Sequence, residues 1–174
     1  MTPRTGATTV VSAPTELDAA RLYQEGIVAG VIGAAIVAIW FFIVDLASGR
    51  PLYTPTVLGT VLFRRGAPLD ALDAIAPSPG VVLMFTWVHG LVFAAVGGVA
   101  SRLLGMAERN PSLGFGVLLL FVVFEAGFTV AAMVLAAPVL HALAWPSILV
   151  ANLLAAGGMA LYFRLRHPAM RVSP

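Results

Sequence analysis

The sequence predicts an all-α fold: an integral membrane four-helix bundle with short interfacial helices in its first loop. Of the 174 residues, 60% are hydrophobic and only 10% are charged, whereas a soluble domain carries about 25% charged residues. Because so few charges cannot cover a surface in water, we expect lipid to surround much of the chain. The apolar residues also gather into long stretches, which at about 1.5 Å per residue can cross a hydrocarbon core of about 30 Å.

The chain begins with a polar segment of small side chains and prolines. We interpret residues 1–14 as a disordered cytoplasmic tail, residues 15–168 as a single transmembrane domain and residues 169–174 as a C-terminal tail. Thr15 is placed to cap the first helix, because acidic residues follow it at the positive end of the helix dipole. No apolar core precedes this helix, so we expect the first span, and not a cleaved signal peptide, to direct insertion.

Four apolar stretches are long enough to be transmembrane helices. The predicted spans are Gly26–Leu46, Val81–Leu104, Leu113–Ala137 and Val139–Phe163. The sequence allows two start positions for the fourth span. Either Pro146 kinks a helix that begins near Val139, or it stands in the first turn of a helix that begins at Pro146 itself.

The loop between the first two predicted spans is long and contains two candidate helices. Thr54-Pro55 is typical of a cap followed by proline at the first helical position, and predicts a helix that ends at Phe63. Residues Pro68–Ala76 predict a second short helix. We expect both helices to lie on the outer membrane surface. A long ordered loop is often functional, but here it could equally be a cover for the bundle.

The arginines predict the orientation of the chain. With four spans, both termini and the second loop share one side of the membrane. That side holds seven arginines and the other side three: Arg4, Arg21, Arg102, Arg109, Arg164, Arg166 and Arg171 against Arg50, Arg64 and Arg65. Because positive charge is enriched on the cytoplasmic side, we expect both termini in the cytoplasm and the chain in a bacterial inner membrane.

The composition also excludes several classes of protein. All ten basic residues are arginines, which is typical of a GC-rich genome, and they form no basic stripe that would indicate nucleic-acid binding. Cysteine is absent, which excludes disulfides, thiolate metal sites and a cysteine nucleophile. No glycine-rich phosphate loop and no Gly-x-Ser-x-Gly turn occurs, so an enzyme is disfavoured.

Small residues recur at helical spacing in three of the predicted spans, which lets helix backbones approach closely in lipid. They are Gly26, Gly30, Gly33 and Ala34 in the first span, Gly90, Ala94, Gly97, Gly98, Ser101 and Gly105 in the second, and Ser147, Ala151 and Ala155 in the fourth. These faces could form a homodimer or pack the helices of one chain together. Their number favours internal packing.

Five polar side chains lie within the predicted spans, where buried charge is costly and therefore marks a functional candidate. The candidates are Asp45, His89, Glu125, His141 and Asn152. Counted from the outer ends of their spans, His89 lies at a depth of roughly 12 Å and Glu125 at roughly 16 Å, so these two side chains could meet. All five fall in the outer half or at the midplane. We expect no comparable residue in the cytoplasmic half.

Three interpretations of these candidates stay open. In the first, which is slightly favoured, His89 and Glu125 form a buried structural pair, since each relieves the desolvation of the other. In the second, the polar residues line an outward-facing site for a divalent metal, a proton or a small ligand. In the third, histidines hold a haem, which is disfavoured because His89 and His141 differ in depth by roughly 12 Å. No motif of diagnostic spacing supports a metal, so we assign no cofactor.

The stretch from Gly26 to Asp45, with Trp40-Phe41-Phe42 inside it, and the following Gly49-Arg50-Pro51 and Thr54-Pro55 resemble small, uncharacterised four-span inner-membrane proteins of GC-rich bacteria. That resemblance implies no activity. We expect a structural or accessory membrane subunit, as a homodimer or within a larger membrane complex. The alternative is a binding or transport protein that uses the outward-facing His/Glu site.

Overall fold

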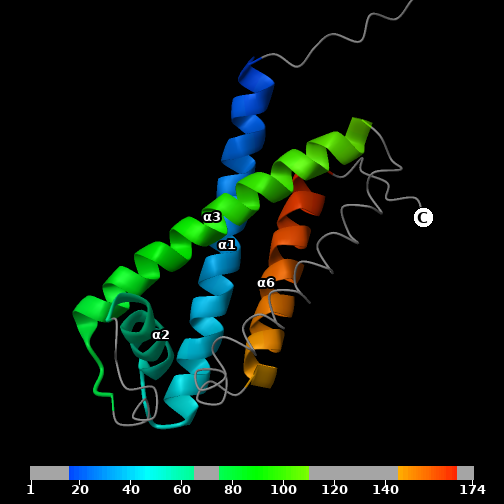
Figure 1. Ribbon diagram of the computed structural model, residues 1–174. Coiled ribbons are helices and arrows are strands. Elements are labelled where there is room, and N and C mark those ends of the chain that lie inside the picture. The colour runs from blue at the N-terminus through cyan, green and yellow to red at the C-terminus, as the bar shows by residue number, and fades with distance from the viewer. Residues whose placement is uncertain (1–15, 65–74, 110–144, 168–174) are drawn as a thin grey trace, which may run out of the picture.

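The computed structural model describes residues 16–64, 75–109 and 145–167, and every element of secondary structure in these ranges is a helix (Figure 1). The helices are α1 (Glu16–Ala47), α2 (Tyr53–Phe63), α3 (Pro79–Arg109) and α6 (Trp145–Arg166). Three of them contain stretches long and apolar enough to cross a membrane: Ala20–Ala47, Pro79–Met106 and Pro146–Arg166. The prediction of an all-helical fold with apolar helices long enough to cross a membrane is therefore confirmed for these ranges. The predicted third span and both predicted tails lie outside them.

Helix α1 is the centre of the described structure, because α3, α6 and α2 all pack against it. At one end of α1, Ser101 Oγ of α3 donates a hydrogen bond of 2.5 Å to the carbonyl of Leu22. Further along α1, His89 of α3 contacts Ala34. Residue numbers thus rise along α1 as they fall along α3, so these two helices are antiparallel.

Helix α6 is also antiparallel to α1. Near the start of α6, Trp40 Nε1 of α1 donates to both the carbonyl oxygen and Oγ of Ser147, at 3.1 and 3.0 Å. At the other end of α6, His167 meets Glu25 of α1. Because α3 and α6 are each antiparallel to α1, they run in the same direction, as Figure 1 shows.

Glycines allow α1 and α3 to cross in backbone contact. A Cβ atom added at Gly30 would overlap the carbonyl of Phe93, and one at Gly97 would overlap the carbonyl of Gly26. On α6, Ala151 and Ala155 are buried. The prediction that small residues pack the helices of one chain together is confirmed at these positions. Gly90 differs, since no described atom lies within 4 Å of a Cβ added there.

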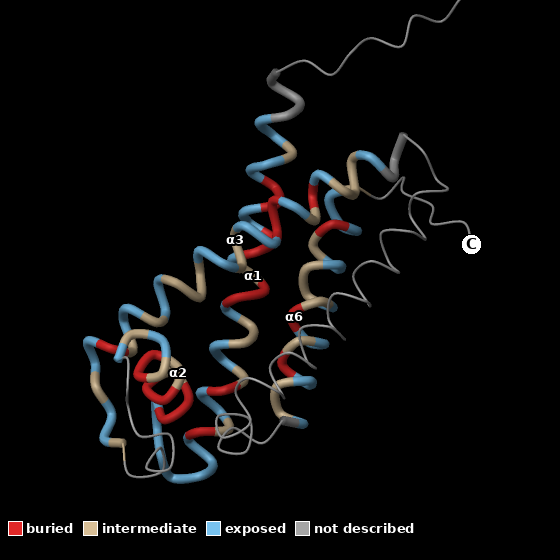
Figure 2. The backbone as a smooth tube through the Cα atoms, in the orientation of Figure 1, coloured by how far each residue is buried: buried red, intermediate tan, exposed pale blue. Residues whose placement is uncertain are grey.

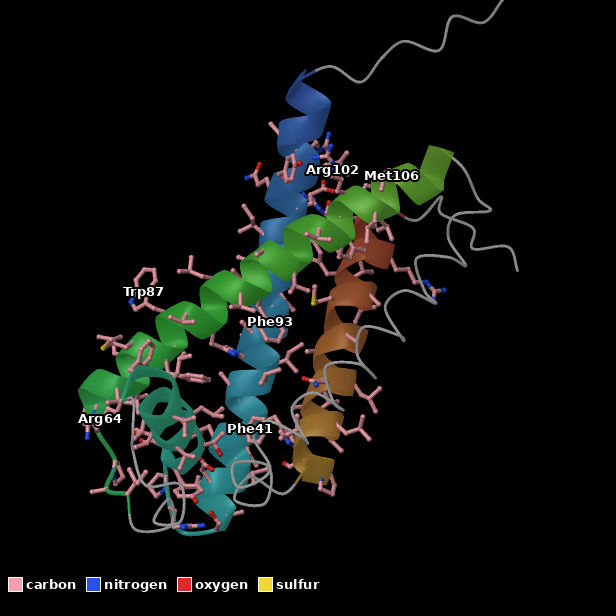
Figure 3. The ribbon with its side chains drawn as sticks, in the orientation of Figure 1. Phe41, Arg64, Trp87, Phe93, Arg102 and Met106 are labelled. Carbon is pink, nitrogen blue, oxygen red and sulfur yellow. The ribbon has the colours of Figure 1, made fainter. Side chains whose placement is uncertain are left out.

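Many large apolar residues of the three long helices are exposed, and Figure 2 shows exposed residues along all three helices. The side chain of Trp87 is 67% exposed and points away from the other helices in Figure 3. Leu91, Val99, Leu153 and Leu165 are similarly exposed. So much exposed apolar surface is unusual for a protein in water. It is the surface expected of helices whose solvent is lipid.

Helix α2 differs in two ways from the prediction. It begins at Tyr53, after Leu52 in the left-handed conformation (φ 65°), and Thr54 does not act as its cap. It is also enclosed on more than one side, with Thr56, Val57 and Thr60 almost fully buried. It packs against α3 and α1, and its position at the outer membrane surface stays a prediction. The predicted helix over 68–76 lies mostly outside the described residues, and residues 75–76 are not helical.

The described part of the fourth span is α6, Trp145–Arg166, which contains Pro146. Whether this span begins near Val139 or at Pro146 stays open. Residues 139–144 lie outside the described residues.

Candidate functional site

The carboxylate of Asp45 connects α1 to α2. Its Oδ2 accepts a hydrogen bond from the backbone amide of Thr54 (2.8 Å), and its Oδ1 accepts one from the Thr54 hydroxyl (2.7 Å). Asp45 is only 2% exposed. Burial of an ionised carboxylate is costly unless hydrogen bonds replace its water, and Thr54 supplies them. Asp45 therefore takes the place of an N-cap for α2, at the end of the helix where negative charge is favourable.

His89 connects α3 to α1. Its Nε2 lies 3.2 Å from the carbonyl oxygen of Ala34, and because a carbonyl only accepts, this nitrogen is the donor. The imidazole is stacked on Phe85 at a centroid distance of 5.7 Å and tilted against Phe93 at 4.7 Å. The described contacts of His89 are thus those of a side chain that packs two helices together.

The five predicted site residues do not all fall within the described ranges. Asp45 engages Thr54, His89 engages Ala34, and Asn152 is half-buried on α6. Glu125 and His141 lie outside the described residues, so the His89–Glu125 pair stays a prediction. Within the described residues, no three His, Asp or Glu side chains form a group that could hold a metal ion.

A buried ionic cluster forms at the opposite end of α1. Glu25 is 6% exposed, and its Oε2 lies 2.8 Å from Nε2 of His167. Its Oε1 lies 3.5 Å from Nε of Arg21 and 3.7 Å from a terminal guanidinium nitrogen of Arg166. These four residues, hereafter the Glu25 cluster, join the first turns of the α1 span to the end of α6.

The Glu25 cluster corrects the prediction that the half of the bundle near the termini holds no buried ionisable residue. Glu25 immediately precedes the apolar stretch that begins at Gly26, so it lies just outside the predicted first span Gly26–Leu46. One signal was present, because Arg21 and Glu25 are spaced to pair on one helix face. Nothing in the sequence indicates His167 as a partner, since 142 positions separate it from Glu25.

The ends of α1 and α3 are also joined beside this cluster. The guanidinium of Arg102 donates a hydrogen bond to the hydroxyl of Tyr23, and the hydroxyl of Ser101 bonds the carbonyl of Leu22. Arg102 lies at the upper end of the molecule in Figure 3, opposite Arg64. The first turns of the α1 span are therefore bonded to both α3 and α6.

A hollow of about 420 Å³ opens between α1 and α6 at the Glu25 cluster. Its volume lies within the range of about 300–1,000 Å³ that is usual for small-molecule sites. It is lined by two guanidinium groups, an amide, a phenol, a carboxylate and apolar side chains, among them Arg21, Gln24, Glu25, Val28, Tyr162 and Arg166. This arrangement can bind and orient a charged group. Among the described residues that line it, no nucleophile lies beside a general base.

The fold and these contacts define a helical membrane protein whose described polar side chains mainly join one helix to another. A comparison with protein-family models, curated proteins and solved structures finds no match for the chain.

Proposed function

We propose that the chain is a four-span protein of a bacterial inner membrane, with its third crossing over Leu113–Ala137. Two observations support this third crossing. Helices α3 and α6 run in the same direction, so the chain has to return from the end of α3 to the opposite end, where α6 begins. The sequence between them contains an apolar stretch of the required length.

We propose further that both termini lie in the cytoplasm. The support is the distribution of arginines over the two ends of the described structure. Arg21, Arg102, Arg164 and Arg166 lie toward one end, with the start of α1 and the end of α6, whereas Arg50 and Arg64 lie at the other, with α2 (Figures 1 and 3). The more basic end of a membrane protein generally faces the cytoplasm.

The role proposed for the protein is structural or accessory, without catalysis of its own. This proposal is supported by the hydrogen bonds that its described polar side chains make within the chain. These bonds are Asp45 with Thr54, His89 with Ala34 and Trp40 with Ser147. Each of these bonds joins two elements of the chain. A catalytic or transport site would instead direct such groups into a shared cavity.

The role can be tested on membranes that contain the tagged full-length chain. After mild detergent extraction, we expect native electrophoresis to resolve an assembly heavier than the 18.1 kDa chain with its micelle, and mass spectrometry to identify a stoichiometric second subunit or further copies. Elemental analysis of the purified protein is expected to find no stoichiometric metal. A monomer that retains a metal, and loses it when Glu125 is changed to Gln, would instead support the binding or transport role.

A further inference from the structure

The Glu25 cluster carries an excess of positive charge. Two guanidinium groups, of Arg21 and Arg166, face one carboxylate. Among the described side chains of this cluster, the guanidinium groups therefore outnumber the carboxylates. Arg164 and Arg102, both exposed, add further positive charge at the same end of the molecule. The hollow therefore favours an anion over a cation.

The two arginines keep donors for a ligand. Their distances to Glu25 Oε1, 3.5 and 3.7 Å, exceed the roughly 2.7–2.9 Å of a strong charge-assisted hydrogen bond. A guanidinium carries five N–H donors in a fork that matches the oxygens of phosphate. The side chains of Arg21 and Arg166 are 76% and 52% exposed, so a ligand can reach both. Glu25, held by His167, would act as the counter-ion that positions them.

The hollow also lies at the expected boundary of the membrane. Arg21 is the second residue of the span Ala20–Ala47, and Arg166 is the last residue of the span Pro146–Arg166. Lipid phosphates lie at this level, just outside the hydrocarbon core. The apolar side chain of Val28, one to two turns further into the span, lines the same hollow and could contact the beginning of an acyl chain.

We propose that this hollow binds a phosphate ester, and that the ligand is the headgroup of an anionic phospholipid. Arg21 and Arg166 bind the phosphate oxygens, while Gln24 and Tyr162 supply neutral donors. Basic pockets between membrane helices on the cytoplasmic side are known to select such headgroups. The structural or accessory role does not depend on this site, and the site does not depend on that role.

The test measures lipid binding to the full-length protein in detergent by native mass spectrometry, with phosphatidylglycerol, phosphatidylcholine and inorganic phosphate as separate probes. We expect phosphatidylglycerol to bind more tightly than phosphatidylcholine, whose cationic choline offsets the phosphate charge. The double change Arg21→Gln and Arg166→Gln should weaken phosphatidylglycerol binding by about tenfold or more. Equal binding of the two lipids would overturn the proposal.

Arg164→Gln is the control for Arg166, because it removes one positive charge from the same turn of α6, and Arg164 is not among the residues that line the hollow. It should change binding by no more than about twofold, as expected for an exposed surface charge. A loss as large as that of the double variant would overturn the proposal, since the attraction would then be diffuse. Inorganic phosphate that displaces the lipid at comparable concentration would overturn the lipid as the ligand and support a free phosphate.

A second variant keeps the test decisive where the double variant does not fold. Gln24→Leu removes one donor from the hollow and leaves the ion pairs of Glu25 in place. It is expected to weaken phosphatidylglycerol binding by about fivefold, the effect of one neutral hydrogen bond. Binding that equals the wild type would overturn the assignment of this hollow.

Discussion

Asp45 accepts two hydrogen bonds from Thr54, one from the backbone amide and one from the hydroxyl, and both groups are buried. The carboxylate belongs to the last turn of α1, and Thr54 belongs to the first turn of α2. Between them, Gly49 adopts a positive φ of 71° and Leu52 one of 65°. The chain thus reverses sharply, and one carboxylate holds the two helices in their relative positions.

Asp45→Ala is expected to lower the free energy of unfolding by about 2–3 kcal/mol, because the Thr54 amide and hydroxyl lose a charged acceptor while buried. Thr54→Val should cost less, about 1 kcal/mol, since the hydrogen bond from the backbone amide of residue 54 to Asp45 remains. Thermal or denaturant unfolding in detergent measures both. Thr86→Val is the control, because the exposed Thr86 hydroxyl bonds only a carbonyl of its own helix. An Asp45→Ala protein as stable as the wild type would contradict this account.

Gly97→Ala is expected to destabilise the protein by about 1–3 kcal/mol, because its methyl group would overlap the carbonyl of Gly26 and force α1 and α3 apart. Gly157→Ala is the matched control, since no described atom lies within 4 Å of the added methyl group. Alanine is a better helix former than glycine, so this control should be as stable as the wild type or more so. Equal effects of the two changes on the unfolding midpoint would disprove the close crossing.

Trp40→Phe should lower stability by about 1 kcal/mol, because phenylalanine lacks the indole N–H that donates to the carbonyl oxygen and Oγ of Ser147. Ser147→Ala should cost less, since the backbone carbonyl of residue 147 remains as an acceptor. A double-mutant cycle measures the coupling. Trp87→Phe serves as the control, because Trp87 is exposed and its replacement should change stability by less than about 0.5 kcal/mol. Additive effects of Trp40→Phe and Ser147→Ala would argue against the contact.

The proposed orientation can be tested by labelling single cysteines, since the chain has none of its own. Arg64→Cys follows α2, and Arg164→Cys lies in the last turn of α6, at opposite ends of the described structure. In bacterial cells whose outer membrane has been permeabilised, a maleimide that cannot cross the inner membrane should label Arg64→Cys at once. It should label Arg164→Cys only after the inner membrane is permeabilised. The reverse pattern would invert the orientation, and labelling of both in intact inner membranes would reject it.

The helices could be predicted from the sequence because helix formation in a bilayer depends on the residues of each segment alone. Inside a bilayer every backbone amide and carbonyl needs a partner within the protein, and a long apolar segment meets this need as a helix. The helical spacing of small residues also indicated which helix faces pack closely. Gly26, Gly30 and Gly97 lie in backbone contact between α1 and α3. The end of α2 at Phe63 was predicted correctly, but the helix begins at Tyr53, two residues before the proline that was expected to begin it.

The partners of the polar side chains could not be predicted in the same way. Thr54 was expected to cap α2, but its hydroxyl is bonded to Asp45, nine positions earlier. One interpretation placed Asp45 and His89 in a common polar site, and the described contacts of these two side chains are with Thr54 and Ala34. A side chain's depth in the membrane follows from its position in the span. The direction in which it points depends on how the helices are rotated against each other.

The sequence by itself thus determined the class of the protein: an apolar, all-helical chain whose long helices suit a bilayer, because hydropathy and length act segment by segment. Only the tertiary structure decided that Asp45 holds α2 and that Glu25 meets Arg166 and His167 at the far end of the chain. Such contacts depend on the crossing of α1 with its neighbours, which close approach at a few glycines and alanines establishes. Local sequence patterns do not indicate which residues the crossing brings into contact.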